Sequence, residues 1–86
     1  MLTRPNDSQR SGFEKVLNLR GLRCPQPVLR AKKTLRDIAA GDTLVLECTD
    51  PLTVIDIPAF ANQTGHTLVS YESKDGLHIF KLVKRA

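Results

Sequence analysis

The sequence is poor in the residue types that carry most protein chemistry. Its 86 residues include two cysteines, two histidines, one tyrosine and no tryptophan. Two cysteines are too few for a disulfide scaffold, and no apolar run is long enough for a transmembrane helix or the core of a signal peptide. We therefore expect a cytoplasmic protein with reduced cysteines and no membrane association. A chain of this length forms one small domain and leaves no room for a separate cofactor domain.

The spacing of the possible ligands disfavours a metal site. The two cysteines and two histidines would have to converge, and no two of them have the short spacing typical of metal sites. His66 follows Gly65, a predicted helix end, and His78 alternates with apolar residues in a predicted strand. Surface or half-buried positions therefore fit both histidines better. We expect neither a metal nor a cofactor.

Apolar alternation and turn residues predict four strands, at residues 13–19, 44–48, 67–72 and 77–83. The connection Lys74-Asp75-Gly76 predicts a tight hairpin between the last two. The strand over 44–48 is nearly all apolar and is expected to be central. Cys48 ends it, so we interpret this cysteine as a core residue rather than a catalytic one. Polar residues 1–12 are expected to form a disordered tail before a single domain over residues 13–86.

Two helices are predicted between these strands. The first covers residues 25–39 and carries an apolar stripe made of Val28, Ala31, Leu35 and Ile38. The second runs from an N-cap at Asp56 to about residue 63, because Pro58 separates it from a short turn over residues 52–55. With right-handed crossovers, both helices lie on one face of a mixed four-stranded sheet. The predicted fold is an α/β (α+β) two-layer sandwich with the order β-α-β-α-β-β.

Cys24 is the candidate reactive residue because it directly precedes the first predicted helix. A helix N-terminus carries about +0.5 of an elementary charge, which lowers the pKa of a nearby thiol and favours the reactive thiolate. Arg20 and Arg23 are expected to add to this field. A junction between arginines is also a poor place to bury a thiol. We therefore expect Cys24 to be exposed and activated.

The prolines around Cys24 are expected to stiffen its backbone. If Cys24 is the N-cap, Pro25 and Pro27 offer no N–H group in the first turn, and the Gln26 N–H is the natural partner of the sulfur. However, Pro27 disfavours a helical Gln26, so the regular helix is alternatively expected to begin nearer Pro27. In either case Arg23, Pro25, Gln26 and Pro27 form the frame of the candidate site.

Two other cysteine chemistries fit this segment poorly. Cys24 and Arg30 have the C-x5-R spacing of cysteine-dependent phosphatases, whose loop wraps a phosphate with successive backbone N–H groups. Here two of the five intervening residues are prolines and none is a glycine. Thioredoxin-type exchange needs a second cysteine in a C-x-x-C motif, and position 27 is Pro27. A lone thiolate suits transfer to or from another protein.

The net charge of +4 is concentrated around the first helix, at Arg20, Arg23, Arg30, Lys32, Lys33 and Arg36. We expect Arg20, Arg30, Lys33 and Arg36 to contact an acidic partner surface. Direct RNA contact is conceivable through phosphates, but it is not expected because aromatic residues make up only 5% of the chain. A regulatory or binding module that uses this helix, with Cys24 incidental, is the alternative function, and a simply solvated helix face is the ordinary explanation of the charges.

Residues 17–28, LNLRGLRCPQPV, resemble the signature of the TusA (SirA-like) sulfur-carrier proteins. In that signature a strand is followed by Arg-Gly-X-X-Cys-Pro-X-Pro and a helix. Further matches occur in the family's order, at Gly41-Asp42, Asp50-Pro51, Asp56-Ile57-Pro58 and Gly65-His66. The resemblance covers about residues 15–84 and implies the same compact sandwich.

The resemblance also implies a function. Cys24 would accept sulfane sulfur from a cysteine desulfurase as a persulfide, framed by Arg23, Pro25 and Pro27, and pass it to a downstream acceptor protein. Uses in the family include thiolation of the wobble uridine in tRNA, which we favour, molybdenum-cofactor synthesis and sulfur oxidation. Many members have a second cysteine where this chain has Ala61, so we expect a single-cysteine relay. We expect a monomer that acts as a carrier rather than as a turnover enzyme on its own.

Overall fold

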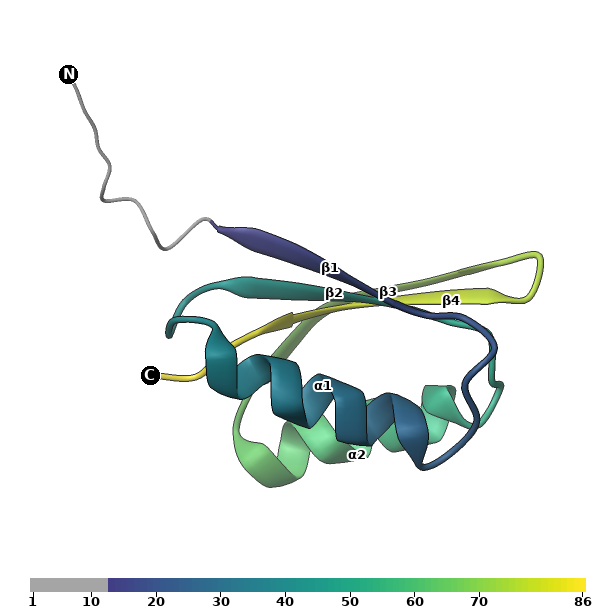
Figure 1. The fold of residues 1–86 in the computed structure, drawn as a ribbon, viewed down its shortest axis with the longest axis horizontal. Helices are drawn as coiled ribbons and strands as arrows, with labels where there is room; N and C mark the ends of the chain where they lie inside the picture. The colour runs from purple at the N-terminus through teal and green to yellow at the C-terminus, as the bar shows by residue number, and fades with distance from the viewer. Residues whose placement is uncertain (1–12) are drawn as a thin grey trace, which may run out of the picture.

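The computed structural model describes residues 13–86, which form a sheet covered on one face by two helices (Figure 1). The elements are β1 (Glu14–Leu19), α1 (Gln26–Asp37), β2 (Thr43–Cys48), α2 (Thr53–Thr64), β3 (Thr67–Lys74) and β4 (Leu77–Val83). The predicted order β-α-β-α-β-β and the two-layer arrangement are confirmed. The expected disordered tail, residues 1–12, lies outside the described residues. None of the helices in the described part of the chain is long and apolar enough to span a membrane.

The strand order is β1-β2-β4-β3, which local patterns in the sequence did not predict. β1 and β2 are parallel neighbours, with Leu17 opposite Leu46. β4 is antiparallel to both β2 and β3, so the sheet is mixed. Because the carboxyl ends of parallel neighbours meet at one edge of a sheet, the connections after β1 and β2 leave that edge together. These two connections, residues 20–25 and 49–52, build the candidate site.

The core lies between the sheet and the helices. It contains Leu19, Ala31, Leu35, Leu44, Leu46, Cys48, Ile57, Phe60, Ala61, Phe80 and Leu82. Every element from β1 to α2 and the inner strand β4 supplies a side chain that is 0% exposed: Leu19, Ala31, Leu44, Leu46, Cys48, Ile57 and Leu82. Cys48 is 0% exposed, which confirms its interpretation as a core residue. Burial raises the pKa of its thiol to about 11, against a smaller lowering by a hydrogen bond with Thr53 and a further increase from the charge of Asp50.

Helix α1 carries the predicted apolar stripe on its buried side. Ala31 and Leu35 are buried, and Val28 and Ile38 are partly buried against the core. The helix is slightly shorter than predicted, because Ile38 is already extended, with φ −106° and ψ 163°. The side-chain ammonium of Lys84 donates to the carbonyl oxygen of Ile38 at 2.6 Å and so satisfies one of the last carbonyls of the helix.

Helix α2 corrects the prediction for its beginning. The N–H groups of Thr53 and Ile55 donate to the carbonyls of Asp50 and Leu52, so the turn expected over residues 52–55 is the first turn of the helix itself. Asp56 is therefore the fourth helical residue and not the N-cap. Pro58 lies inside the helix, and the carbonyl that its ring crowds is four residues earlier, in the first turn, where the disturbance is limited.

The C-terminal half of the chain follows the predicted turn chemistry. Gly65 ends α2 in the left-handed region, with φ 84°, and its N–H donates to the carbonyl of Ala61. Asp75 and Gly76 also have positive φ, at 51° and 82°, as a tight type I′ hairpin requires. The hairpin between β3 and β4 is therefore confirmed, with β3 two residues longer than predicted.

Candidate functional site at Cys24

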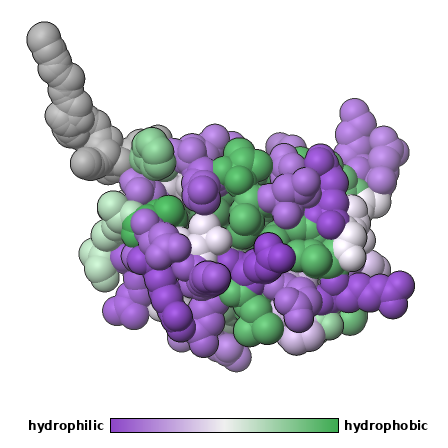
Figure 2. Space-filling model, in the orientation of Figure 1, coloured by the Kyte–Doolittle hydropathy of each residue, from purple (hydrophilic) through white to green (hydrophobic). Residues whose placement is uncertain are grey.

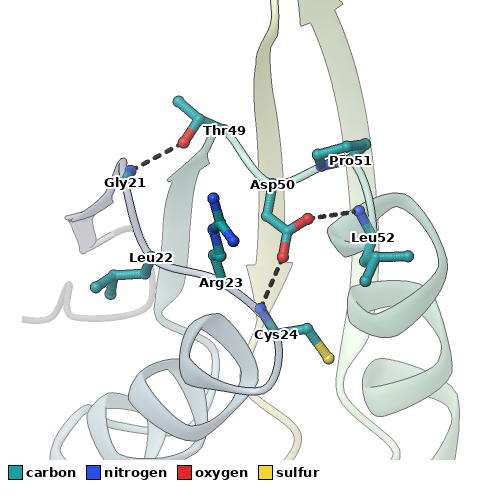
Figure 3. A pocket seen from close by; sticks show the side chains of 8 residues that line it. All are labelled: Gly21, Leu22, Arg23, Cys24, Thr49, Asp50, Pro51 and Leu52. Carbon is teal, nitrogen blue, oxygen red and sulfur yellow. Dashed lines mark hydrogen bonds between the residues drawn. The ribbon is translucent and has the colours of Figure 1, made fainter.

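Cys24 lies exposed at the end of the β1–α1 connection, beside a pocket of ≈ 580 Å³ (Figure 3). The pocket is lined by residues 21–24 from this connection and 49–52 from the β2–α2 connection. Its two walls come from neighbouring parallel strands, so the sheet brings together segments that are far apart in the sequence. The thiol is thus at the open edge of a hollow that a second molecule can reach.

Asp50 and Thr49 join the two walls of the pocket. The Cys24 N–H donates to Oδ2 of Asp50 at 2.7 Å, and the Leu52 N–H donates to Oδ1 of the same carboxylate at 3.0 Å. The Gly21 N–H donates to Oγ1 of Thr49 at 2.9 Å. A carboxylate that accepts two backbone N–H groups makes strong, charge-assisted hydrogen bonds. The backbone of Cys24 is therefore fixed from outside its own segment.

The predicted backbone partner of the sulfur is wrong. Pro25, not Cys24, occupies the N-cap position, and the regular helix begins at Gln26. The Gln26 N–H donates to the carbonyl of Arg23 at 2.8 Å and is therefore engaged elsewhere. The alternative prediction of a helix beginning nearer Pro27 describes the structure better. Pro27 is also buried, so its ring packs in the protein interior as well as stiffening the backbone.

The predicted lowering of the Cys24 pKa is also wrong, because the fold brings carboxylates to the thiol. A hydrogen bond with Asp56 raises the pKa of Cys24 above the ordinary value of 9.0, and slight desolvation of the exposed thiol and the negative charges of Asp56 and Asp50 raise it further. Asp56 comes from the first turn of α2. At neutral pH the free thiol is thus mostly protonated, and its reactivity rests on its exposure rather than on a low pKa.

The two arginines near Cys24 interact with carboxylates rather than with the thiol. Arg20 forms an ion pair with Glu47 of β2, with 3.4 Å between Nη2 and Oε1. The positive charge of Arg23 acts on Asp50, whose pKa is lowered chiefly by the hydrogen bonds from Cys24 and Leu52 and also by Arg23. Arg23 thus stabilises the carboxylate that holds the site.

The four predicted partner-binding residues come from two segments of the chain. Arg30, Lys33 and Arg36 are exposed on α1, while Arg20 lies beyond β1 in its ion pair with Glu47. Hydrophilic side chains cover much of the face that carries α1 (Figure 2). Arg36 lines a second, smaller hollow of ≈ 240 Å³ between the helices. It is ten residues beyond the start of α1, about 15 Å along the helix axis.

Each of the two histidines has a structural partner. Nδ1 of His66 accepts the N–H of Arg85 at 3.1 Å, and burial followed by the charges of Arg85 and Lys84 lowers the pKa of His66. Nδ1 of His78 is 3.0 Å from the hydroxyl oxygen of Tyr71. Within residues 13–86, no three side chains of the types that bind metals come together.

Sequence reasoning missed Asp50, Thr49 and Asp56 as site residues. In the sequence, Thr49-Asp50-Pro51 signals a helix start and matches the family resemblance, and Asp56 is interpreted as a helix cap, but neither pattern points to the thiol. The partners Cys24 and Asp50 are 26 residues apart, so no local pattern connects them. A parallel pairing of the first two strands was the signal that would have placed both connections at one edge.

Comparisons with known proteins agree with the fold and indicate the family. The sequence model of the family "Sulfurtransferase TusA" matches residues 15–84. The chain is 43% identical over 72 residues to the sulfur carrier protein TusA of Allochromatium vinosum, covering 84% of this chain and 95% of that protein. Its fold is similar to the crystal structure of a SirA-like protein from Desulfitobacterium hafniense, with a TM-score of 0.72, 23% identity, and coverage of 83% of this chain and 97% of that one. The chain belongs to the TusA sulfur-carrier family.

Proposed function

We propose that this protein carries sulfane sulfur as a persulfide on Cys24 and hands it to an acceptor protein. The observation that carries the proposal is the exposed Cys24 thiol at the rim of an open pocket, with its backbone held by Asp50. The other cysteine, Cys48, is fully buried and out of reach of a partner. A member of a sulfur-carrier family therefore has one accessible thiol in residues 13–86 on which to load sulfur.

Loading and delivery are two exchanges of the same kind. In loading, the deprotonated Cys24 sulfur attacks the outer sulfur of a donor persulfide, a new S–S bond forms, and the donor cysteine leaves as a thiolate with the electron pair of the broken S–S bond. In delivery, an acceptor thiolate attacks the outer sulfur on Cys24, which then leaves as a thiolate. No net oxidation or reduction occurs. The proton of Cys24 goes to solvent water when the thiol ionises.

The raised pKa of Cys24 is compatible with this role. Fewer molecules are ionised at neutral pH, but a thiolate of higher pKa is intrinsically more nucleophilic. The carboxylates also disfavour a free anion on the sulfur of the isolated carrier. Sulfur exchange would then proceed mainly in a complex with a partner, which suits a carrier that must not lose its sulfur to small molecules.

The donor and acceptor follow from the carrier chemistry. We infer a cysteine desulfurase as the donor and a second sulfur-carrying protein as the acceptor, with tRNA wobble-uridine thiolation as the favoured use. Relay to molybdenum-cofactor synthesis or to sulfur oxidation would use the same Cys24 exchange. We place this relay in the cytoplasm, with the protein acting as a monomer and without a cofactor of its own.

The test is direct loading. The protein is incubated with a cysteine desulfurase, pyridoxal phosphate and cysteine, and its intact mass is measured. Wild type and Cys48→Ala are expected to gain one sulfur atom, and Cys24→Ser is expected to gain none. An unmodified wild-type protein beside an active desulfurase would sink the proposal.

A binding module is the second candidate, favoured by the exposed cations of α1. Among residues 13–86, Arg30, Lys33 and Arg36 take part in none of the ion pairs, so their charges are available to a partner. On this account, reversing these three charges abolishes function in cells while Cys24→Ser preserves it. The sulfur-carrier account predicts loss of function with Cys24→Ser. The two substitutions therefore separate the candidates in one experiment.

A further inference from the structure

The two connections that line the pocket are held together by few contacts, and Asp50 makes the central one. Its carboxylate bridges the N–H of Cys24, at 2.7 Å, and the N–H of Leu52, at 3.0 Å (Figure 3). We propose that Asp50 is a positioning residue for sulfur transfer, which fixes the backbone of Cys24 and hence the place where the sulfur meets a partner. This proposal rests on the proposed function of Cys24.

The backbone around Cys24 has few other means of being fixed. Pro25 has no N–H, and the Gln26 N–H is used within the same connection by the carbonyl of Arg23. Among residues 24–26, the Cys24 N–H is therefore the backbone donor that binds the opposite wall of the pocket, at Asp50. Because Cys24 is exposed, packing does little to hold its position. The hydrogen bond to Asp50 therefore fixes the backbone position of Cys24, as packing would for a buried residue.

The charge of Asp50 has a second, separable effect. Its carboxylate is one of the negative charges that raise the pKa of the Cys24 thiol, with Asp56 contributing more. The anchor favours transfer, because a reacting atom must be held in a productive position. The charge instead keeps the thiol protonated. Replacement by asparagine removes the charge and keeps an acceptor oxygen, whereas replacement by alanine removes both.

A purely structural role for Asp50 makes a different prediction. Asp50 also accepts the N–H of Leu52, the N-cap residue of α2, and so satisfies a backbone donor at the N-terminus of that helix. If that were its whole role, Asp50→Ala would lower stability, and the folded fraction of the variant would still transfer sulfur at the wild-type rate. Transfer measured per folded molecule therefore distinguishes positioning from capping.

The experiment compares Asp50→Ala and Asp50→Asn with Asp75→Asn, a matched charge change in the β3–β4 turn. The Asp75 carboxylate is not among the charges that raise the pKa of Cys24, and asparagine tolerates the positive φ of 51° at this position. Sulfur transfer from a loaded desulfurase is measured by quenching and intact mass, at several carrier concentrations and with the folded fraction taken from circular dichroism. Iodoacetamide alkylation of Cys24 is measured across pH. Amide hydrogen exchange at Cys24 is followed by NMR.

We expect Asp50→Ala to lower the rate of transfer per folded molecule about tenfold or more, in kcat rather than KM, and to speed exchange of the Cys24 amide. Asp50→Asn is expected to stay within about threefold of wild type, because one oxygen still accepts. Both substitutions should move the alkylation profile to lower pH, since both remove the charge. Asp75→Asn should change none of these quantities.

Two results would overturn the positioning role. One is transfer by folded Asp50→Ala at the rate of Asp75→Asn. The other is an equal loss in Asp50→Ala and Asp50→Asn, which would assign the effect to charge alone. A wild-type protein that takes up no sulfur would instead refute the proposed function of Cys24, and the role of Asp50 in transfer with it. Failure of the positioning role and failure of the sulfur-carrier role therefore give different patterns.

Discussion

Cys24 and Cys48 are the same residue type in opposite surroundings. Cys24 follows β1 and is exposed, and Cys48 ends the neighbouring parallel strand β2 and is fully buried. Both thiols have a raised pKa, but burial is the main cause for Cys48, whereas a hydrogen bond with the Asp56 carboxylate is the main cause for Cys24. The difference teaches that access, and not a low pKa, separates Cys24, the cysteine proposed to carry sulfur, from Cys48, which packs in the core.

The largest expected difference is in alkylation of the native protein. Iodoacetamide should modify Cys24 readily and Cys48 roughly a thousandfold or more slowly, because Cys48 is reached only through unfolding. Mass spectrometry of the native protein should show one adduct, and of the denatured protein two. Two adducts formed at similar rates on the native protein would break the comparison.

The two cysteines should also differ in their contribution to stability. Cys48→Ala is expected to lower the free energy of unfolding by about 1–2 kcal/mol, because it leaves a small cavity in the core. Cys24→Ala removes an exposed side chain and should leave the stability unchanged. Urea denaturation of both variants measures this, and equal losses would contradict the assignment of Cys48 to the core.

Burial of Cys48 predicts a dependence of stability on alkaline pH. Its pKa is about 11 in the folded protein against an ordinary 9.0, so above pH 9.0 the unfolded chain releases this proton while the folded protein keeps it. The free energy of unfolding should therefore fall as the pH rises from about 9 towards 11. Cys48→Ala should lack this part of the decrease. Identical alkaline profiles for wild type and Cys48→Ala would show that burial leaves the pKa unshifted.

The smallest expected effect is on the ionisation of Cys24. Asp56→Asn should move the pH profile of Cys24 alkylation to lower pH, because Asp56 is the main cause of the raised pKa. Arg20→Gln is the matched control, since Arg20 is paired with Glu47 and should leave the profile unchanged. A shift to higher pH in Arg20→Gln would mean that Arg20 activates the thiol, as the sequence alone suggested.

What the sequence predicts well is what local pattern determines. The apolar stripe of α1, the β3–β4 hairpin at Asp75 and Gly76, and the end of α2 at Gly65 follow from spacing and backbone preference. Pro58 misled the prediction because a proline near the start of a helix disturbs only its first turn. The element order is therefore readable, while the start of α2 was placed too late.

The site was predicted only in part, because its geometry is long-range. The sequence predicts that Cys24 is exposed beside two prolines and that Cys48 is buried, and the structure confirms both. The sign of the Cys24 pKa shift depends on Asp50 and Asp56, which reach the thiol only when β1 and β2 pair in parallel. The residues next to Cys24 in the sequence therefore predict the effect of the arginines, but not the larger effect of the Asp50 and Asp56 carboxylates.

The most direct test of the sulfur-carrier role is to locate the sulfur. The protein is loaded from radioactive cysteine by a desulfurase, separated from it, digested without reductant and analysed by peptide mapping. The account predicts that the label lies in the peptide containing Cys24, is released by a thiol reductant and passes to an acceptor thiol. Label found on Cys48, or label on no cysteine peptide at all, would contradict it.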